Sequence, residues 1–473
     1  MPLPQIASSN VPSTLDAFRS DPADWNALPG ELQLKVCKLL GLSDLKQLRL
    51  VSHHWRDGVE FRLKDLRRCE AHCTEWIERV EANAWCDPPR IDPIFADNAG
   101  ALASRFPDMA LALNLQQVRA ALAAGATFPV THQYCDLRDL NPDMALWSVV
   151  RMPAGEPLFV ASVEVESDRP AIVVCAPDGT RRMPDVLRGF RPVIDNQAGD
   201  ATLQGASVTA GRLVLPVQRI EDGRIALYLP DTDQVEALPE QFVEDPNGHL
   251  PHVSLSADAR FVAAVFERGL RIYDRVGGEL VEHDRGMADA GFSVDSRGDV
   301  FAGEPDVWDD DEDAWAQPLD GQHRLFTFNR ATRQWQVLPD VLGHGMDWLT
   351  LSPDERYLVK AHGDSVVIAD RRAPDIAIEL RGAPDRRFRP GAMTAGISRA
   401  GMFMAVAYGN QSIGLFDLTG SKGGDVLEPK VALQLPASAQ GATPSLLFSE
   451  DGSRLDVVYG SATGADFVGY ALT

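Results

Sequence analysis

Four potential metal ligands lie close together in the sequence: Cys69, His72, Cys73 and Cys86. Structural zinc sites most often use close ligand pairs of the Cys-x-x-Cys kind. Here Cys69 and Cys73 are four residues apart on a predicted helix and Cys86 follows it, so the spacing does not match such a site. Six cysteines in 473 residues do not indicate a disulfide scaffold either. We therefore expect buried or unreactive thiols, with no metal ion and no cofactor.

An acidic run from Asp306 to Asp313 is the second segment with chemical potential. Carboxylates are ligands for hard cations such as Ca²⁺, and an acidic loop can also meet a basic protein. The run lacks the alternating ligands and central glycine of an EF-hand loop, so a solvated surface loop is the plainer interpretation. Trp308 and Trp315, which lie within and just after the run, are candidate contacts for a substrate protein.

Enzyme signatures are absent from the sequence: it has no Gly-x-Ser-x-Gly, no P-loop and no dinucleotide-binding fingerprint of the required spacing. The formal net charge of -23 argues against nucleic acid or an anionic membrane as the main partner, because both attract positive charge. No apolar run approaches the roughly 20 residues of a membrane span, and the N-terminus does not resemble a secretory signal peptide. We expect a protein that is not an enzyme and acts by binding other proteins.

The elements that must position these residues change character along the chain. Residues 1–24 carry Pro, Ser and Asn without apolar periodicity and are predicted to be disordered. Residues 25–62 show helical apolar spacing and form a predicted compact block, which residues 63–133 continue as a helical linker. From residue 134 to residue 473, short apolar strands bounded by Gly, Pro, Asp and Asn predict an all-β domain.

A degenerate repeat runs through the predicted β domain. Each copy has an apolar strand, a turn of the Ser-x-Asp kind, a second apolar strand and a third strand that ends in Asp and a turn. Such a turn suits a tight hairpin, because Asp bonds to nearby backbone amides and Gly or Pro fixes the dihedral angles. Clear copies recur about every 40–50 residues, the period of a β-propeller blade. Four clear copies and three weaker ones predict a β-propeller of about seven blades. The clear copies contain VSLSADARFVAAVF, LTLSPDERYLVKAH, AGISRAGMFMAVAY and LLFSEDGSRLDVVY.

The helical block resembles an F-box, whose pattern begins with Leu-Pro and ends with Trp. Between them come Glu-Leu, an aliphatic residue, a Leu pair, Asp-Leu, Leu and Val. The match covers residues 28–60 and agrees in order, spacing and residue type, although Lys46 and Gln47 stand where many members carry apolar or mixed residues. The candidate adaptor-binding positions are Leu28, Pro29, Leu32, Val36, Leu39, Leu40, Leu45, Leu48, Val51 and Trp55.

This resemblance implies a three-helix module that binds the Skp-type adaptor of a cullin ubiquitin ligase. A module this small cannot bury all of its own apolar side chains, and exposed apolar surface commonly marks a partner site. Trp55 is the expected anchor, since interface hot spots favour Trp. The competing interpretation is that these apolar residues are merely the core of a helical domain.

F-box proteins pair this module with a repeat domain that recognises a target, so the resemblance implies a substrate receptor for an unknown target protein. The propeller repeat lacks the Gly-His and Trp-Asp signatures of WD repeats and the paired glycines of kelch repeats, so no particular target is implied. Two alternatives stay open. One is a hydrolase with converging carboxylates in the propeller channel, recruited by the F-box. The other is a competitor that occupies the adaptor without delivering a target.

A looser resemblance concerns the origin of the chain. An F-box on a chain rich in Ala, Arg and Pro resembles a type III secreted effector of a plant-pathogenic bacterium. The resemblance implies that residues 1–24 hold the secretion signal and that the protein acts in the cytoplasm or nucleus of the host cell. A eukaryotic F-box protein of the cytoplasm or nucleus is the alternative.

Lysine is scarce in this chain. Seven of the 45 basic residues are lysine, and none lies between Lys64 and Lys360. Codon bias in a GC-rich genome accounts for this simply. A sharper hypothesis is that a receptor held beside a ubiquitin-charged enzyme is exposed to self-modification, which a surface with few lysines resists.

Overall fold

The computed structural model describes residues 30–39, 45, 47–48, 53–82, 107–136 and most of 146–473. The longer segments outside the described residues are 1–29, 83–106, 137–145, 152–158, 176–180, 196–201, 244–251, 284–291, 304–324, 339–347, 383–391 and 436–443. The chain divides into two compact units. One comprises residues 1–79 with 89–116, and the other comprises residues 80–88 with 117–473.

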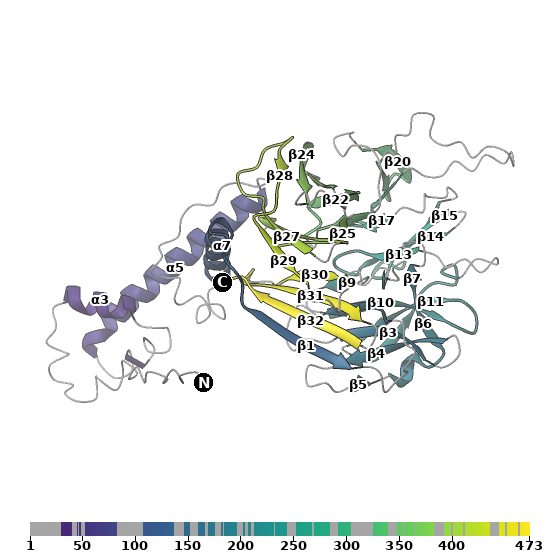
Figure 1. The fold of residues 1–473 in the computed structure, drawn as a ribbon, viewed down its shortest axis with the longest axis horizontal. Helices are drawn as coiled ribbons and strands as arrows, with labels where there is room; N and C mark the ends of the chain where they lie inside the picture. The colour runs from purple at the N-terminus through teal and green to yellow at the C-terminus, as the bar shows by residue number, and fades with distance from the viewer. Residues whose placement is uncertain are drawn as a thin grey trace, which may run out of the picture. The chain divides into compact units, whose positions relative to one another are not determined.

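The first unit contains α3 (Gly30–Leu39), most of α5 (His53–Ala82) and the first part of α7 (Pro107–Ala123) (Figure 1). Carboxylates stand in the first turns of α3 and α7, where the helix dipole favours negative charge. Buried side chains recur every three or four residues along much of α5, so that one apolar stripe of the helix is covered. These side chains are Trp55, Val59, Leu63, Leu66, Cys73 and Ile77.

The boundary predicted between residues 62 and 63 falls inside a helix, since α5 runs through it without interruption. The expected F-box end and the expected start of the linker therefore belong to one helix of 30 residues. The physical reason lies in the sequence itself. Buried positions continue on the same stripe through Leu63 and Leu66, and no Pro or Gly stands between residues 62 and 82 to end the helix.

Glu70 of α5 caps the N-terminus of α7. Its carboxylate accepts hydrogen bonds from the backbone amides of Met109, at 3.0 Å, and Asp108, at 3.3 Å. The first amides of a helix have no partner within the helix, so an acceptor from another element satisfies them. Burial raises the pKa of Glu70, and the two amide bonds oppose that shift. Thr74 Oγ1 completes the junction by donating to the Asp108 carboxylate at 2.7 Å.

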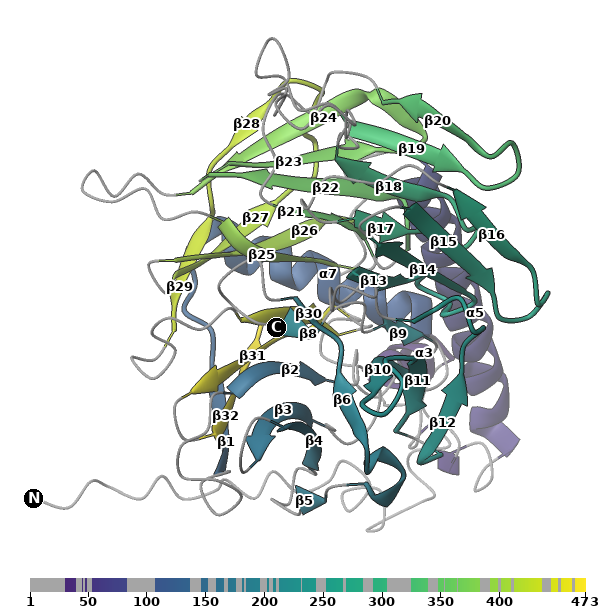
Figure 2. The ribbon, with the colours of Figure 1, turned by 90° about the vertical axis from the view of Figure 1, so that its right-hand side faces the viewer.

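The second unit contains the predicted β-propeller, which is confirmed. Its described strands form seven sheets of four or five strands and one sheet of two strands. Figure 2 shows the larger sheets arranged around a common centre, with β13, β17 and β21 toward the inside and β12, β16 and β20 toward the outside. Within each larger sheet, most strands pair antiparallel with the strand that follows in the chain, which is the meander of a propeller blade.

The strands of these sheets have the following bounds. Three sheets hold β2 (Leu146–Arg151), β3 (Phe159–Val165), β4 (Arg169–Cys175) and β5 (Arg181–Arg182); β6 (Phe190–Pro192), β9 (Ser207–Thr209), β10 (Arg212–Arg219), β11 (Ile225–Leu229) and β12 (Gln234–Ala237); and β13 (His252–Leu255), β14 (Phe261–Phe266), β15 (Gly269–Asp274) and β16 (Leu280–His283). Three more hold β17 (Phe292–Val294), β18 (Val300–Gly303), β19 (Leu325–Asn329) and β20 (Gln334–Val337); β21 (Trp348–Leu351), β22 (Tyr357–His362), β23 (Ser365–Asp370), β24 (Ala373–Arg381) and β28 (Val426–Leu427); and β25 (Ala392–Ile397), β26 (Phe403–Tyr408), β27 (Ser412–Asp417) and β29 (Val431–Gln434). The last holds β1 (Val130–Asp136), β30 (Ser445–Phe448), β31 (Arg454–Ser461) and β32 (Gly464–Ala471), while β7 (Ile194–Asp195) and β8 (Thr202–Leu203) pair with each other.

The two ends of the propeller sequence meet in the last of these sheets. β1 pairs antiparallel with β32 along its full length. Thr131 Oγ1 donates to the Gly469 carbonyl at 3.2 Å, and His132 Nε2 lies 2.6 Å from the buried Asp466 carboxylate. This strand begins at Val130, earlier than the predicted propeller start at residue 134. It precedes the first copy of the repeat and lacks the repeat's turn, so the pattern did not include it.

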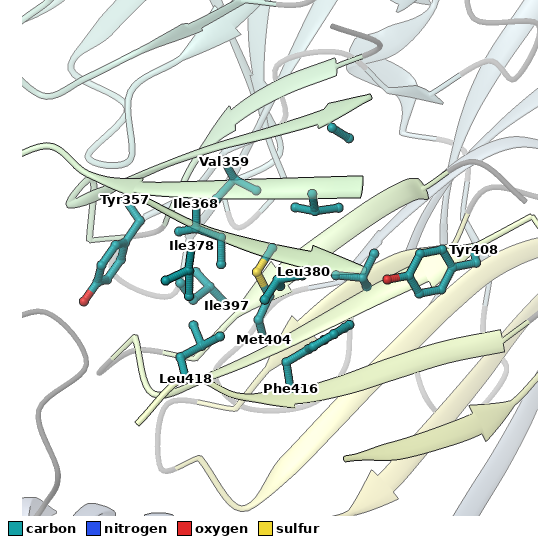
Figure 3. Packing of buried hydrophobic residues seen from close by; sticks show 13 residues of the cluster. Tyr357, Val359, Ile368, Ile378, Leu380, Ile397, Met404, Tyr408, Phe416 and Leu418 are labelled. Carbon is teal, nitrogen blue, oxygen red and sulfur yellow. The ribbon is translucent and has the colours of Figure 1, made fainter. Parts of the chain in front are cut away.

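Neighbouring sheets pack through buried aliphatic and aromatic side chains, and this packing is why blades fold together as a ring. Figure 3 shows the cluster between the β21–β24 and β25–β29 sheets, which includes Tyr357, Ile368, Met404 and Phe416. Equivalent clusters join β10 and β11 to β13 and β14, and β14 and β15 to β18 and β19. The described core side chains come from six sheets, and β2–β5 is described by its backbone alone. These side chains therefore account for six blades, one fewer than the count of about seven that the repeat predicted.

The repeated Ser-x-Asp turn has one construction in several sheets. Between β13 and β14, the Phe261 amide donates to Ser256 Oγ at 3.0 Å, and the Ser256 hydroxyl donates to Asp258 at 2.6 Å. Ser352, between β21 and β22, repeats both bonds at 2.9 and 2.5 Å. Three residues after the start of each turn the backbone has positive φ, a conformation that favours glycine. The residues at this position are Ala259, Gly298, Glu355, Gly401 and Gly452.

Candidate functional site

The candidate adaptor-binding side chains that are described fall into two groups by exposure. On α3, Leu32 is 43% exposed and Val36 is partly buried, and Leu48 is partly buried as well. Leu45 and Trp55 are buried. An apolar side chain that stays in water when the chain is alone gains free energy when a partner covers it. Leu32 is therefore the most exposed of the described candidate positions.

Trp55 was the expected anchor for the adaptor, and that contact stays a prediction. Its side chain is 2% exposed, and Val59, one helical turn further along α5, is buried with it. Residues four apart lie on the same face of a helix, so the indole belongs to the covered stripe. Trp55 thus contributes to the core of the helical unit rather than to an open surface.

Phe61 is an exposed apolar residue that the F-box pattern did not single out. Its side chain on α5 is 51% exposed. It lies two residues from both Val59 and Leu63, and residues two apart do not share a helix face. The signal was therefore present in the sequence, since an aromatic residue out of phase with an apolar stripe is expected to face solvent.

Several predicted site residues lie outside the described residues. They are Leu28, Pro29, Leu40, Val51, Trp308 and Trp315. Leu39 is the last residue of α3, and its side chain also lies outside the description. The adaptor contact of the Leu-Pro start and the substrate contact of the two tryptophans stay predictions.

Two cysteines of the helical unit, Cys37 and Cys73, are buried, and Cys69 is partly buried. Burial raises the pKa of Cys73 to about 12, and it also raises the pKa of Cys37. The thiolate is the form that binds metal, so a buried thiol of raised pKa is a poor ligand. Among the described residues no group of three or more His, Cys, Asp or Glu side chains is arranged to hold a metal ion, and Cys86 lies outside them.

Arginine side chains join neighbouring sheets of the propeller in a repeated arrangement. Arg275, next to the end of β15, donates to Glu236 of β12 at 2.9 Å. Arg371, at the matching position after β23, pairs with the buried Asp295 that follows β17. Arg371 also donates to the backbone carbonyl of Glu355 at 2.6 Å. The arrangement ties adjacent blades and leaves these charges engaged with each other.

The Glu355 carboxylate links the turns of three sheets. It accepts the Ala257 amide at 3.1 Å and the Ser296 amide at 2.8 Å. A hydrolytic centre of the kind weighed from the sequence would need carboxylates that converge on one another. The two Glu355 carboxylate oxygens meet backbone donors from two other sheets, so this residue ties the three turns together.

Comparisons with known proteins bear on the fold only weakly. No protein-family model and no curated protein matches the chain. Among solved structures, it is similar to KlHsv2 with loop 6CD replaced by a Gly-Ser linker, at 9% identity and a TM-score of 0.45, over 68% of this chain and 92% of that one. It is also similar to the RRP9 WD40 repeats, at 12% identity and a TM-score of 0.42, over 72% and 100% of the two chains. The propeller assignment rests on the sheet topology.

Among the described helices, none is both long and apolar enough to cross a membrane.

Proposed function

We propose that this protein is the substrate-receptor subunit of a cullin-type ubiquitin ligase. Its helical unit binds the Skp-type adaptor, and its propeller binds a target protein. The observation that carries the proposal is the exposed Leu32 on α3, within a segment that resembles an F-box. Burying a leucine that is exposed in the free chain contributes about 1.5–3 kcal/mol at most.

The propeller supplies the other half of the proposed receptor. A ring of blades presents broad faces of turns, and binding residues are commonly carried by loops on a rigid scaffold. The excess of acidic residues favours a target with a basic surface, since complementary charge steers association.

The proposed place of action is a host cell. The composition and the N-terminal segment resemble a type III secreted effector of a plant-pathogenic bacterium, and such a protein would use the host's ubiquitin machinery in the cytoplasm or nucleus. Expression in plant cells is accordingly the setting for the functional test.

Capture from plant cell extract tests the adaptor contact. Tagged protein is expected to retain the Skp-type adaptor and a cullin. Leu32→Asp should reduce the retained adaptor by about tenfold or more, because it places a carboxylate where an apolar contact is expected. Val276→Asp is the matched control, since Val276 is an equally apolar, 79% exposed residue of the propeller, and it should leave capture unchanged. Equal capture by both variants would refute this contact.

Target abundance separates a receptor from a competitor. In cells that express the intact protein, a receptor lowers the abundance of a small set of proteins that recover when the proteasome is inhibited. Leu32→Asp should abolish this loss. A competitor would instead raise the abundance of proteins that host receptors deliver, and a hydrolase would change its substrate without proteasome dependence.

A further inference from the structure

Fewer lysines of the propeller are exposed to solvent than the sequence contains. Lys360 is the first lysine after Lys64, and it lies in β22 with strands on both sides. Its side chain is 2% exposed. The two lysines that follow it in the chain, Lys422 and Lys430, are both exposed. The propeller sequence therefore offers two accessible lysines, and they are eight positions apart.

Both lysines lie at the ends of one ordered segment, residues 421–430, which we name the strap. Its strand β28 pairs parallel with β24, the outermost member of its own sheet's meander. The Glu379 amide donates to the Asp425 carbonyl at 2.9 Å, and the Gly424 amide donates to the Ala377 carbonyl at 2.8 Å. The strap thus covers the edge of a blade that is not its own.

The backbone at each lysine is held while the side chain stays in solvent. The Lys422 amide donates to the Asp425 carboxylate at 2.7 Å, and the Lys430 amide donates to the Leu415 carbonyl at 2.7 Å. A fixed backbone with an exposed amine presents the nucleophile at a constant place on the outer edge of the propeller.

We propose that the strap is the propeller's ubiquitin-acceptor site, with Lys422 and Lys430 as the modified residues. This rests on the proposed function, because the conjugating enzyme is brought by the ligase that the chain recruits. The uncharged Nζ attacks the carbonyl carbon of the thioester between ubiquitin and the conjugating enzyme. The new C–N bond forms, the C–S bond breaks, and the amine's proton ends on the departing cysteine thiol.

The strap would confine ubiquitin attachment on the propeller to one place. Ubiquitin attached there extends from the edge of the β21–β24 sheet, and the remaining lysine of the propeller stays in the core. Scarcity of lysine from codon bias does not by itself place the accessible residues together. Their shared position on one strap makes a single segment responsible for the modification of the whole propeller.

Mapping of ubiquitin remnants by mass spectrometry tests this assignment. The tagged full chain is purified from plant cells treated with a proteasome inhibitor, beside the double variant Lys422→Arg, Lys430→Arg. We expect remnants on Lys422 or Lys430, none on Lys360, and loss of all propeller-borne ubiquitin in the double variant. Arginine keeps the charge and the backbone contacts, so the fold is retained.

The outcomes separate this inference from the proposed function. Adaptor capture without remnants on the strap, or with remnants on Lys360, overturns the inference and leaves the receptor function standing. Remnants on the strap without adaptor capture support the acceptor site and count against the receptor function. Acetylation of the native protein by an N-hydroxysuccinimide ester gives an independent check. It should label Lys422 and Lys430 and should spare Lys360 until denaturant is added, and labelling of native Lys360 would overturn the inference.

Discussion

Two arginine–aspartate pairs occupy equivalent places in different blades and differ in their exposure. Arg356 and Asp370 are both buried, and the Arg356 guanidinium donates twice to the Asp370 carboxylate, at 2.7 and 3.0 Å. Arg260 donates to the two oxygens of Asp274 at 2.7 and 3.0 Å, whereas both Arg356 bonds go to one oxygen of Asp370, and the Arg260 side chain is 43% exposed. The two arginine–aspartate separations along the chain are identical, and the main contrast between the pairs is the burial of the arginine.

Asp370→Asn is predicted to destabilise the propeller by about 3–5 kcal/mol, because it leaves a buried guanidinium without its counter-charge. Asp274→Asn should cost less, since water can solvate the exposed Arg260. Urea unfolding of the two variants and the wild type measures the difference. Equal destabilisation by both changes would contradict the role assigned to burial.

The same residues set a pH dependence. The Arg260 guanidinium, and then the amides of Gly277 and Val276, hold the pKa of Asp274 well below its usual range. A lowered pKa in the folded state contributes stability above the unfolded value of about 3.9, and this contribution is lost as pH falls through the folded value. The stability gap between wild type and Asp274→Asn should therefore narrow between about pH 5 and pH 2. If urea titrations gave a constant stability difference between wild type and Asp274→Asn over that pH range, the stabilising role of the Arg260–Asp274 ion pair would be contradicted.

Residue types alone could show a resemblance to an F-box but not the exposure of the residues that carry it. Leu32 and Trp55 both lie in a helical apolar pattern, yet one is in solvent and the other is in the core. Which face of a helix is covered depends on the elements packed against it, and those come from distant sequence. The contact of Glu70 with the start of α7 was unpredictable for the same reason.

At the scale of elements, the repeated turn was predictable because its bonds are local. Ser256 reaches Asp258 and the Phe261 amide within six residues of sequence, so the signal is contained in each copy. Strand pairing between blades, unlike the turn, depends on residues far apart in the sequence. The two residues of β28 have no periodicity of their own, and their parallel partner β24 lies more than forty residues earlier in the chain.

Close approach of β25 and β30 gives a prediction at this scale. A Cβ added at Gly396 would lie 2.7 Å from the Leu446 carbonyl oxygen of the adjoining sheet. Gly396→Ala is expected to destabilise the propeller by about 1–3 kcal/mol, because backbone must move to admit the methyl group. Gly30→Ala is the control, since nothing lies within 4 Å of its added Cβ. A thermal midpoint unchanged by Gly396→Ala would show that the blades can separate freely.

At the scale of the molecule, pairing of β1 with β32 closes the last sheet with the start of the propeller sequence. Val468 of the central strand β32 is paired on both sides and buried. Val468→Pro removes a ladder hydrogen bond there and should destabilise the propeller as a whole. Hydrogen exchange is expected to rise in all blades together. Faster exchange confined to β1 and β30–β32 would contradict cooperative closure.

The division into a helical unit and a β-propeller was visible in the change of periodicity along the chain, whereas the partners of each were not. A partner protein is recognised by a surface, and one sequence shows residue types without showing which surface they share. The central claim, that the helical unit binds a Skp-type adaptor, therefore needs a direct measurement.

That measurement is native mass spectrometry of the purified protein mixed with a purified Skp-type adaptor, beside the variant Leu28→Ala, Pro29→Ala. The proposed receptor predicts a complex of one protein with one adaptor, which the double variant does not form. Free components alone in the wild-type mixture, or an undiminished complex with the variant, would contradict the account.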